Sequence, residues 1–305
     1  MTSVCTGLWA GLLLLGIQFP TPSPEVEVLE RENFLSLVVD GVTLWTYHYD
    51  PEDGKPFFHP LASVDGTIFT AIRPKDHPWH RGLWFSWKYI DRVNYWEENR
   101  KTGLSEGRTR LLSTHNEVNE ATTVRILQSL EYAPGEIAER VVEEVREIVV
   151  SAPDSSGLYT IDWTARFKAL AEVALDRTPI PGEEGGKAYG GYAGLSIRMN
   201  PGMKQGEFVN GSGLKGRDAH GQPSSWVQFT LPSGAGILFM DHPDNLSSPS
   251  AWYVSRMPYV SPALLFGEPL SLRKGETFVL KYRIVVSATE VNAGEMFDEW
   301  VSISL

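Results

Sequence analysis

The chain has 305 residues, a formal net charge of −11 and one cysteine. Its length allows one large domain or two smaller ones with a sizeable core, and its apolar and aromatic content excludes a mainly disordered chain. The negative charge argues against nucleic acid or an anionic membrane as the main partner, because both require a basic face. A single cysteine excludes an intrachain disulfide.

Residues 8–19 form an almost wholly apolar run, and no charged side chain follows before Glu25. This run is too short to span a bilayer comfortably but suits the apolar part of a signal peptide. We expect a signal peptide at 1–19, a Pro-rich spacer at 20–32 and a periplasmic or secreted protein without membrane contact. Residues 1–7 lack Lys and Arg, and no clear cleavage site follows, so a misassigned start or a retained anchor are the alternatives.

Along the rest of the chain, short runs of β-forming residues recur between turn signals. Asp40-Gly41 favours a tight hairpin, and Tyr159, Ile161 and Trp163 begin a clean alternation. Valines and an isoleucine at 141–149 have helical spacing, but these residues favour strands and we predict a long strand there. The other predicted strands are 34–39, 42–47, 67–72, 83–87, 108–113, 122–130, 226–231, 236–240 and 278–287.

These runs predict an all-β fold, a large antiparallel β-sandwich, closed by a short helix at 293–301. No internal repeat or composition shift marks a second domain, so residues 33–305 are predicted to be a single domain. A Gly- and Pro-rich segment at 174–192 is expected to be an irregular loop, and loops of this length in compact domains are often functional.

The densest group of chemically useful side chains lies at 76–85, which contains His77 and His80, with His59 upstream and His242 as a distant fourth. Imidazole suits both proton transfer near neutral pH and metal ligation. Pro78 disfavours a helix at His77, so the two neighbouring rings converge only if the backbone bends.

Three interpretations of these imidazoles stay open. In the first, His77 and His80 are acid/base groups, with His59 and His242 as support or a second proton carrier. In the second, His59, His77 and His80 hold a metal ion. In the third, the rings bond to backbone at a tight turn and have no chemical role.

Polar and aromatic neighbours extend the candidate site. Arg81 could bind a carboxylate or a vicinal diol, and Asp76 could orient an imidazole, although a salt bridge across the turn is the alternative. Asp241 beside His242 could form the rim of a polar site, or an Asx-type turn. Flat aromatic faces for a sugar ring are expected from some of the remaining candidates, with core packing as the alternative: Trp79, Trp96, Tyr192 and Trp252.

Several common motifs are absent from the sequence. It contains no G-x-G-x-x-G, P-loop, G-x-S-x-G or H-E-x-x-H pattern. Nucleotide-dependent chemistry and serine or zinc hydrolysis therefore have no support. Alternation also predicts that Trp84 and Trp163 belong to the core rather than to a site.

The segments 55–61, 76–85 and 241–243 together resemble a PmoA-like family of exported bacterial proteins, often labelled "methane oxygenase PmoA". The resemblance covers about residues 40–287 and implies a fold similar to the galactose-mutarotase supersandwich. The family usually has histidine where this chain has Trp79. A membrane methane oxygenase would need several apolar spans, which this chain lacks after residue 19, so we interpret the label as a homonym.

The sequence and this resemblance together suggest a secreted carbohydrate-active enzyme, an epimerase, lyase or glycoside-cleaving enzyme. Its expected partner is a small-molecule or oligosaccharide substrate, and no cofactor is expected. A non-catalytic carbohydrate-binding protein is the first alternative, and the metal-dependent oxygenase implied by the family label is the second.

Overall fold

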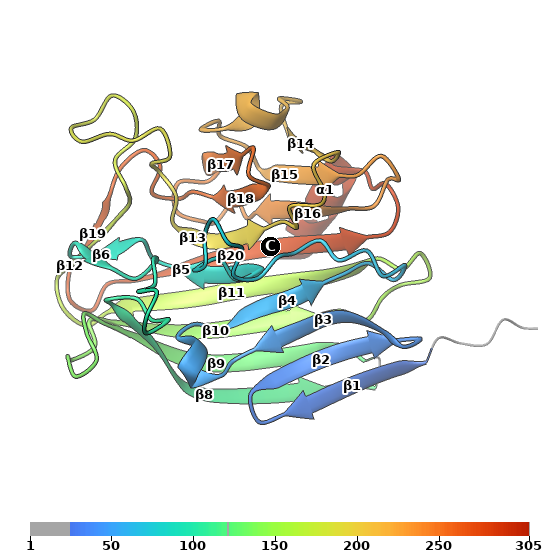
Figure 1. Ribbon diagram of the computed structural model, residues 1–305, viewed down its shortest axis with the longest axis horizontal. Coiled ribbons are helices and arrows are strands. Elements are labelled where there is room, and N and C mark those ends of the chain that lie inside the picture. Colours follow the sequence, from blue (N-terminus) through green and yellow to red (C-terminus); the bar gives the residue numbers. More distant parts are fainter. Residues whose placement is uncertain (1–24, 121, 305) are drawn as a thin grey trace, which may run out of the picture.

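The computed structural model describes residues 25–120 and 122–304. Within these residues nearly all regular structure is β, arranged in two eight-stranded sheets and one four-stranded sheet. Neighbouring strands pair antiparallel throughout, as in β10 with β11 and β13 with β5. The predicted all-β class and large antiparallel sandwich are therefore confirmed (Figure 1). The predicted signal peptide at 1–19 lies outside the described residues.

The first large sheet runs, in spatial order, through β1 (Val26–Arg31), β2 (Phe34–Val39), β3 (Val42–His48), β4 (Phe57–Leu61), β5 (Leu83–Ser86), β13 (Gly194–Arg198), β18 (Tyr259–Pro262) and β17 (Trp252–Ser255). The second runs through β14 (Glu207–Asn210), β15 (Trp226–Thr230), β16 (Gly236–Asp241), β20 (Thr277–Ser287), β11 (Tyr159–Ala169), β10 (Val142–Val150), β9 (Val124–Ala133) and β8 (Arg108–Val118).

A four-stranded sheet of short strands lies at one end of the sandwich, in the order β19 (Leu270–Leu272), β12 (Val173–Asp176), β6 (Tyr89–Ile90) and β7 (Val93–Asn94). The helical elements are two 3-10 turns, η1 (Pro51–Asp53) and η2 (Gly216–Ala219), and the helix α1 (Ala293–Ser304). The predicted irregular loop at 174–192 begins later than expected, because its first residues form β12.

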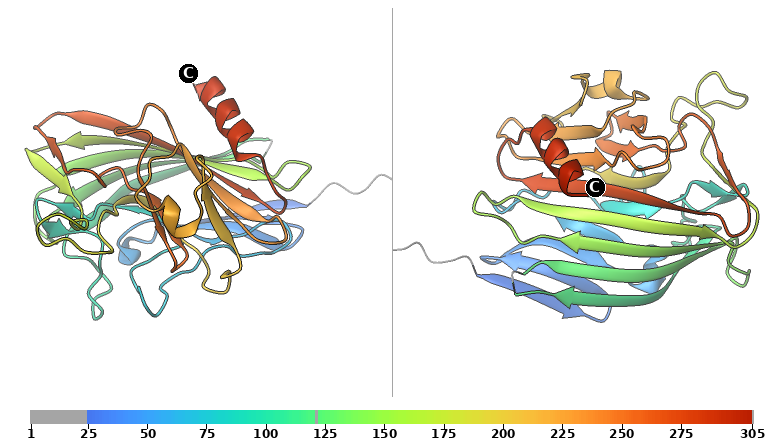
Figure 2. Two further views of the ribbon diagram at one scale, coloured as in Figure 1. Left: turned by 90° about the horizontal axis from the view of Figure 1, so that it is seen from above. Right: turned by 180° about the vertical axis from the view of Figure 1, so that it is seen from behind.

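The core lies between the two large sheets, which form two layers in Figure 2. Alternation fills it as predicted: Tyr159, Ile161 and Trp163 on β11 are fully buried, while the residues between them are only partly buried. Trp163 meets Phe58 of the first sheet, with ring centroids 6.5 Å apart. The hairpin at Asp40-Gly41 also forms, since both residues have positive φ and connect β2 to β3.

The helix α1 covers the outer face of the second sheet rather than its core face (Figure 2). Trp300 of α1 packs in a separate apolar cluster with Leu238 and Met240 of β16 and Val285 of β20. This explains why Val285, on the outward side of β20, is nevertheless buried. No helix in the described part of the chain is long and apolar enough to cross a membrane.

One predicted domain boundary and one predicted strand are wrong. Residues 26–31 were expected in the spacer, but they form β1 and pair along their whole length with β2. Val26 and Val28 pack against the core, so the folded domain begins before residue 33. Residues 67–72 are not a strand: they make only isolated bridges, such as that of Thr70 with Met199.

A buried ion pair lies on the core face of β10. Arg146 donates two hydrogen bonds to Glu144, at 2.6 and 3.0 Å, and both side chains are fully buried. The guanidinium also lies 4.6 Å from the centre of the Trp163 ring, and Tyr132 donates to the same carboxylate. Alternation in this strand therefore turns two charges inward and leaves Val145 exposed.

Replacing Arg146 with Met should destabilise the fold strongly, because Glu144 would keep its burial without its partner. We expect the free energy of unfolding to fall by about 3–5 kcal/mol, measured by urea denaturation. Arg125→Met removes two exposed ion pairs of β9, with Glu117 and Glu147, and should lower the free energy of unfolding far less, because water screens exposed charges. Equal losses in the two variants would contradict this account.

Candidate functional site

One pocket opens beside β17 and β18 and has a volume of about 500 Å³. Its lining comes from segments that are far apart in the sequence, namely 77–80, 96–97, 189–192 and 253–259. Two imidazoles, one carboxylate and six aromatic side chains line it, together with Ser255 and Met257. We call it the aromatic pocket. Its size lies within the usual range of ligand sites in proteins.

The backbone bends at 73–82 and brings His77 and His80 together. His77 N–H donates to the carbonyl of Pro74 at 2.9 Å, and His80 N–H donates to that of His77 at 3.0 Å. Arg73 N–H then bonds to the carbonyl of His80 at 2.8 Å and closes the bend. The two rings consequently stack, with centroids 4.7 Å apart, and both line the aromatic pocket.

The two imidazoles differ in their surroundings. His80 is 4% exposed and packs against the rings of Trp84 and Tyr259. Burial, with smaller contributions from His77 and Arg198, lowers the pKa of His80 to about 2. His80 is therefore neutral across the physiological range. The His77 side chain keeps 34% of its surface exposed and is the accessible ring of the pair.

Asp76 lies beside His77, as the sequence suggested. The His77 Nδ1 atom is 3.1 Å from an oxygen of Asp76, and Arg198 donates to both carboxylate oxygens at 2.9 and 3.0 Å. Partial burial acts in the opposite direction, but the hydrogen bonds from Arg198 and His77 lower the pKa of Asp76 to about 2. Asp76 is thus held ionised between a buried guanidinium and the exposed imidazole.

Glu97 supplies the carboxylate of the pocket and was not among the predicted residues. Tyr192 and Asn94 donate to it at 3.1 and 2.6 Å, and Lys88 forms a close ion pair with it. Burial alone would raise the pKa of Glu97, but Lys88 and these hydrogen bonds lower it. The only sequence signal was its place after Trp96, because nothing distinguishes one acid among 38.

Aromatic rings in mutual contact form one wall of the pocket. Trp96 meets Tyr192 at 5.0 Å between centroids, Tyr192 meets Tyr253 at 5.6 Å, and Tyr253 meets Tyr259 at 5.4 Å. The structure therefore places Trp96 and Tyr192, both predicted as substrate contacts, in the same wall. Trp79 lines the pocket as well and meets His77 edge to face.

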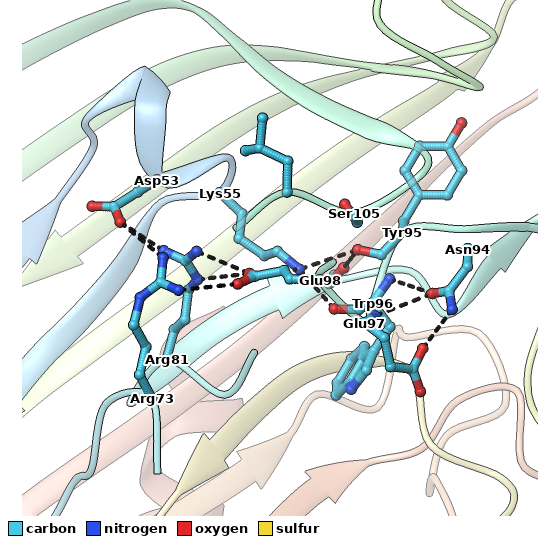
Figure 3. Close-up of polar contacts among 12 residues, drawn as sticks. Asp53, Lys55, Arg73, Arg81, Asn94, Tyr95, Trp96, Glu97, Glu98 and Ser105 are labelled. Atoms are coloured by element: carbon cyan, nitrogen blue, oxygen red, sulfur yellow. Dashed lines mark hydrogen bonds and ion pairs between the residues drawn. The ribbon is translucent and has the colours of Figure 1, made fainter. Parts of the chain in front are cut away.

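Arg81 belongs to a buried charge network (Figure 3). It is fully buried and bonds to Glu98 through Nε and to Asp53 through Nη1, each at 2.9 Å. Lys55, which is 2% exposed, lies 3.6 Å from Glu98 and donates to the carbonyls of Tyr95 and Trp96. The prediction that Arg81 anchors a substrate is therefore wrong, because its guanidinium is fully buried and paired with Glu98 and Asp53.

This network ties the two polar sides of the pocket together. Arg81 follows His80 in the chain, and Glu98 follows Glu97. Burial lowers the pKa of Lys55 to about 8, partly offset by Glu98. The ion pair between Arg81 and Glu98 thus fixes the spacing between the imidazoles and the Glu97 carboxylate.

His59, His242 and Asp241 do not line the aromatic pocket. His59 lies on β4, where its Nδ1 atom is 3.0 Å from the hydroxyl of Thr70, and burial lowers the pKa of His59. His242 is fully buried against Trp300 and accepts from the N–H of Asp244. The prediction that His59 and His242 support the acid/base pair or carry a second proton is therefore wrong, because neither side chain lines the aromatic pocket.

Asp241 and Trp252 are structural as well. Asp241 is fully buried and accepts from Asn245 and from the N–H of Ser250, at 2.7 and 2.8 Å, so it stabilises a turn. Trp252 is fully buried, packs against Phe239 and donates to the carbonyl of Ser224. The interpretation of Trp252 as a sugar platform is therefore wrong, because this ring, unlike that of Trp96, does not line the aromatic pocket.

The metal alternative required His59, His77 and His80 to meet. Over residues 25–120 and 122–304, no group of three or more His, Cys, Asp or Glu side chains is placed to hold a metal ion. His59 instead lies on β4, and only the other two rings stack.

A model of the family described as "Family of unknown function (DUF6807)" matches residues 35–301. The chain belongs to this family. The DUF6807 match gives no support to the PmoA label suggested by the sequence resemblance. No curated protein matches this DUF6807 chain.

Solved structures similar to this DUF6807 chain include an α-galactosidase from Lactobacillus brevis, with 9% identity and a TM-score of 0.35 over 87% of this chain and 40% of that one. The chain thus spans less than half the length of that enzyme. A GalM/aldose epimerase homologue from C. elegans matches with 9% identity and a TM-score of 0.33, over 88% of this chain and 100% of the other. A galactose mutarotase-like protein from Lactobacillus casei matches with 10% identity and a TM-score of 0.20, over 85% and 99%.

The neutral state of His80 makes stability depend on pH. The unfolded chain takes up a proton at this imidazole below about pH 6.5, whereas the folded chain does so only near pH 2. Above about pH 6.5 this imidazole is neutral in both states. Below about pH 6.5 only the unfolded state gains the proton, so the stability of the folded state falls by up to about 1.4 kcal/mol per pH unit. Urea denaturation of His80→Gln between pH 7 and 4 should show a shallower decline than that of the unmodified protein.

The matched control for this measurement is His115→Gln, which removes an imidazole whose side chain is 69% exposed. We expect the pH dependence of this variant to follow that of the unmodified protein. An unchanged slope in His80→Gln would contradict the assignment of a buried neutral imidazole.

Proposed function

We propose that this protein is a carbohydrate-active enzyme that uses general acid–base chemistry in the aromatic pocket. One observation carries the proposal: an accessible imidazole, His77, and an ionised carboxylate, Glu97, line the same aromatic-walled pocket. Such a pair can accept a proton at one point of a bound sugar and donate one at another. The substrate class follows from the wall, since flat aromatic faces suit sugar rings.

His77 is the residue we assign to proton exchange with the substrate. Asp76 lies at its Nδ1 and is held by Arg198, which favours a fixed ring orientation with Nε2 available to a ligand. His80 stacks beneath this ring and stays neutral. We therefore assign His80 a positioning role, in place of the acid/base role that the sequence suggested.

Glu97 is the proposed base. Its carboxylate is ionised through Lys88 and Asn94 and is oriented by the hydroxyl of Tyr192. A substrate hydroxyl beside it would meet an acceptor that already carries its charge, and proton transfer from a positioned group typically accelerates a reaction by about 10²–10⁴-fold. Epimerisation, elimination and glycoside cleavage all use a proton transfer of this kind.

A non-catalytic carbohydrate-binding protein is the second candidate. It is favoured by the composition of the lining, in which six of eleven residues are aromatic. In this alternative the aromatic wall binds the sugar, and His77 and Glu97 only accept or donate hydrogen bonds to it. The two candidates differ in what the loss of the imidazole does.

The decisive experiment compares binding and turnover on a panel of oligosaccharides. His77→Gln should lower kcat by at least about 100-fold while leaving the Kd within a few-fold, because Gln keeps a hydrogen bond but cannot exchange the proton. Trp79→Ala should weaken binding by about tenfold. Calorimetry measures the Kd of each variant, and product analysis by mass spectrometry measures the turnover.

His115→Gln is the control, since it removes an exposed imidazole on β8, outside the aromatic pocket. A turnover rate that survives in folded His77→Gln would remove the catalytic assignment. Binding that depends on Trp79, with no turnover of any sugar by the unmodified protein, would favour the carbohydrate-binding alternative.

We also propose that the protein is exported, on the basis of the apolar run at 8–19. Because β1 begins at Val26 and pairs fully with β2, we expect cleavage before that residue. N-terminal sequencing of the protein recovered from the cell envelope and the medium of a producing bacterium tests this. Full-length protein found only in the cytoplasm would contradict it.

A further inference from the structure

A second pocket adjoins the aromatic pocket. It is lined by positive side chains, whereas the chain as a whole has a negative net charge. Its volume is also about 500 Å³, and Lys204, Arg217 and Arg256 line it. These three cations have no ion-pair partner in the part of the chain that the structure describes. We call this the basic pocket. All three residues are exposed, so their charged groups are accessible to an anion at this concave site although the whole chain has a net charge of −11.

The acidic group at the basic pocket does not cancel this charge. Glu207 lines the pocket, but it is paired with Lys215 at 2.6 Å. The local charge is therefore set by the three unpaired side chains. At physiological ionic strength, charges further away than about 8 Å are largely screened. A small anion in the pocket would be attracted by these cations although the whole chain repels it.

The floor of the basic pocket is apolar. Phe208 and Phe229 are almost fully buried, and their rings meet at 4.9 Å between centroids. Gly206 lies directly over Phe229, and a Cβ there would come within 2.1 Å of the ring. The pocket thus combines an aromatic floor with a cationic rim, which suits a ring-shaped ligand that carries a negative group.

The end of β17 and the turn that follows it contribute residues to both pockets. Ser255 lines both of them. In the following residues the lining alternates, since Arg256 and Pro258 face the basic pocket and Met257 and Tyr259 face the aromatic one. A ligand longer than one sugar unit could therefore occupy both pockets by passing over this turn.

Arg217 is coupled to the aromatic pocket through η2. This turn contacts both β14 and β17. His220, directly after it, accepts a hydrogen bond from the N–H of Val254 at 3.3 Å and meets the ring of Tyr253 at 4.7 Å. Tyr253 is itself part of the aromatic wall. The backbone that carries Arg217 is thus held in place relative to the proposed sugar site.

We infer that the substrate is an acidic oligosaccharide, whose carboxylate or sulfate group binds Lys204, Arg217 and Arg256 while the neighbouring unit occupies the aromatic pocket. This inference rests on the proposed function, because it assigns the sugar site to the aromatic pocket. It adds the chemical class of the substrate and a binding site of its own. Charge-assisted hydrogen bonds from Lys and Arg are the usual way in which proteins hold such anions.

The test compares acidic oligosaccharides with their own uncharged forms. Oligogalacturonides are paired with their methyl esters, and sulfated chondroitin and carrageenan fragments with their desulfated forms. Calorimetry of the full chain should show that at least one acidic member binds about tenfold or more tightly than its uncharged form. Comparison of the uronate pair with the sulfated pairs shows whether the basic pocket binds a carboxylate or a sulfate group.

The triple variant Lys204→Gln, Arg217→Gln and Arg256→Gln should lower the affinity for the acidic form to that for its uncharged form. The matched control is Arg166→Gln, Lys168→Gln and Lys274→Gln, which removes the same charge from exposed positions outside both pockets. This control should leave the tenfold preference intact. It separates a local anion site from a general effect of net charge.

The outcomes distinguish this inference from the proposed function. Equal binding of charged and uncharged forms that depends on Trp79, unaffected by the triple variant, overturns the anion site and supports the sugar site. Acidic ligands that require the three cations but are indifferent to Trp79→Ala support the anion site and overturn the sugar site. If the unmodified protein binds no member of the panel, both are overturned.

Discussion

The aromatic pocket depends on one buried electrostatic interaction, the pairing of Arg81 with Glu98. Neither residue lines the pocket, but each directly follows a residue that does: Arg81 follows His80, and Glu98 follows Glu97. A buried ion pair adds little net stability compared with apolar packing, but loss of one partner leaves a charge without compensation. Such a pair is therefore better suited to fixing the relative position of two segments than to stabilising the fold. Lys55 extends this role by binding the backbone carbonyls of the segment that carries Trp96.

The sandwich as a whole was predictable because its signals are local. Alternation on β11 and the Asp40-Gly41 turn each depend on neighbouring residues, and both are present in the structure. The missed strand β1 also had a local signal, since Val26 and Val28 alternate with acids; the nearby prolines concealed it. Residues 67–72 failed for the opposite reason, because β-forming side chains do not ensure a partner strand.

The site was only partly predictable because its members come from distant segments. The stacking of His77 on His80 required a bend that Pro78 made plausible. Arg81 follows His80 directly, yet it points away from the pocket, and only the position of Glu98 explains why. Trp252 could not be separated from Trp96 by sequence, since both are almost fully buried and only one lines a pocket. Glu97 could be recognised as a site residue only from its contacts with Lys88 and Tyr192, and a single sequence does not reveal these contacts.

His77 and His80 lie three positions apart in one turn, yet the fold gives their imidazoles different surroundings and different chemistry. Burial against Trp84 and Tyr259 removes the water that would solvate a charged His80, and the nearby Arg198 guanidinium makes that charge still less favourable. Arg198 also donates to Asp76, and an oxygen of the Asp76 carboxylate lies 3.1 Å from the His77 Nδ1 atom. A single buried cation thus helps to keep the buried ring neutral and also holds the carboxylate that lies beside the exposed ring. Two identical side chains in one turn therefore need not share one role, and the exposed ring is the one that a substrate can use.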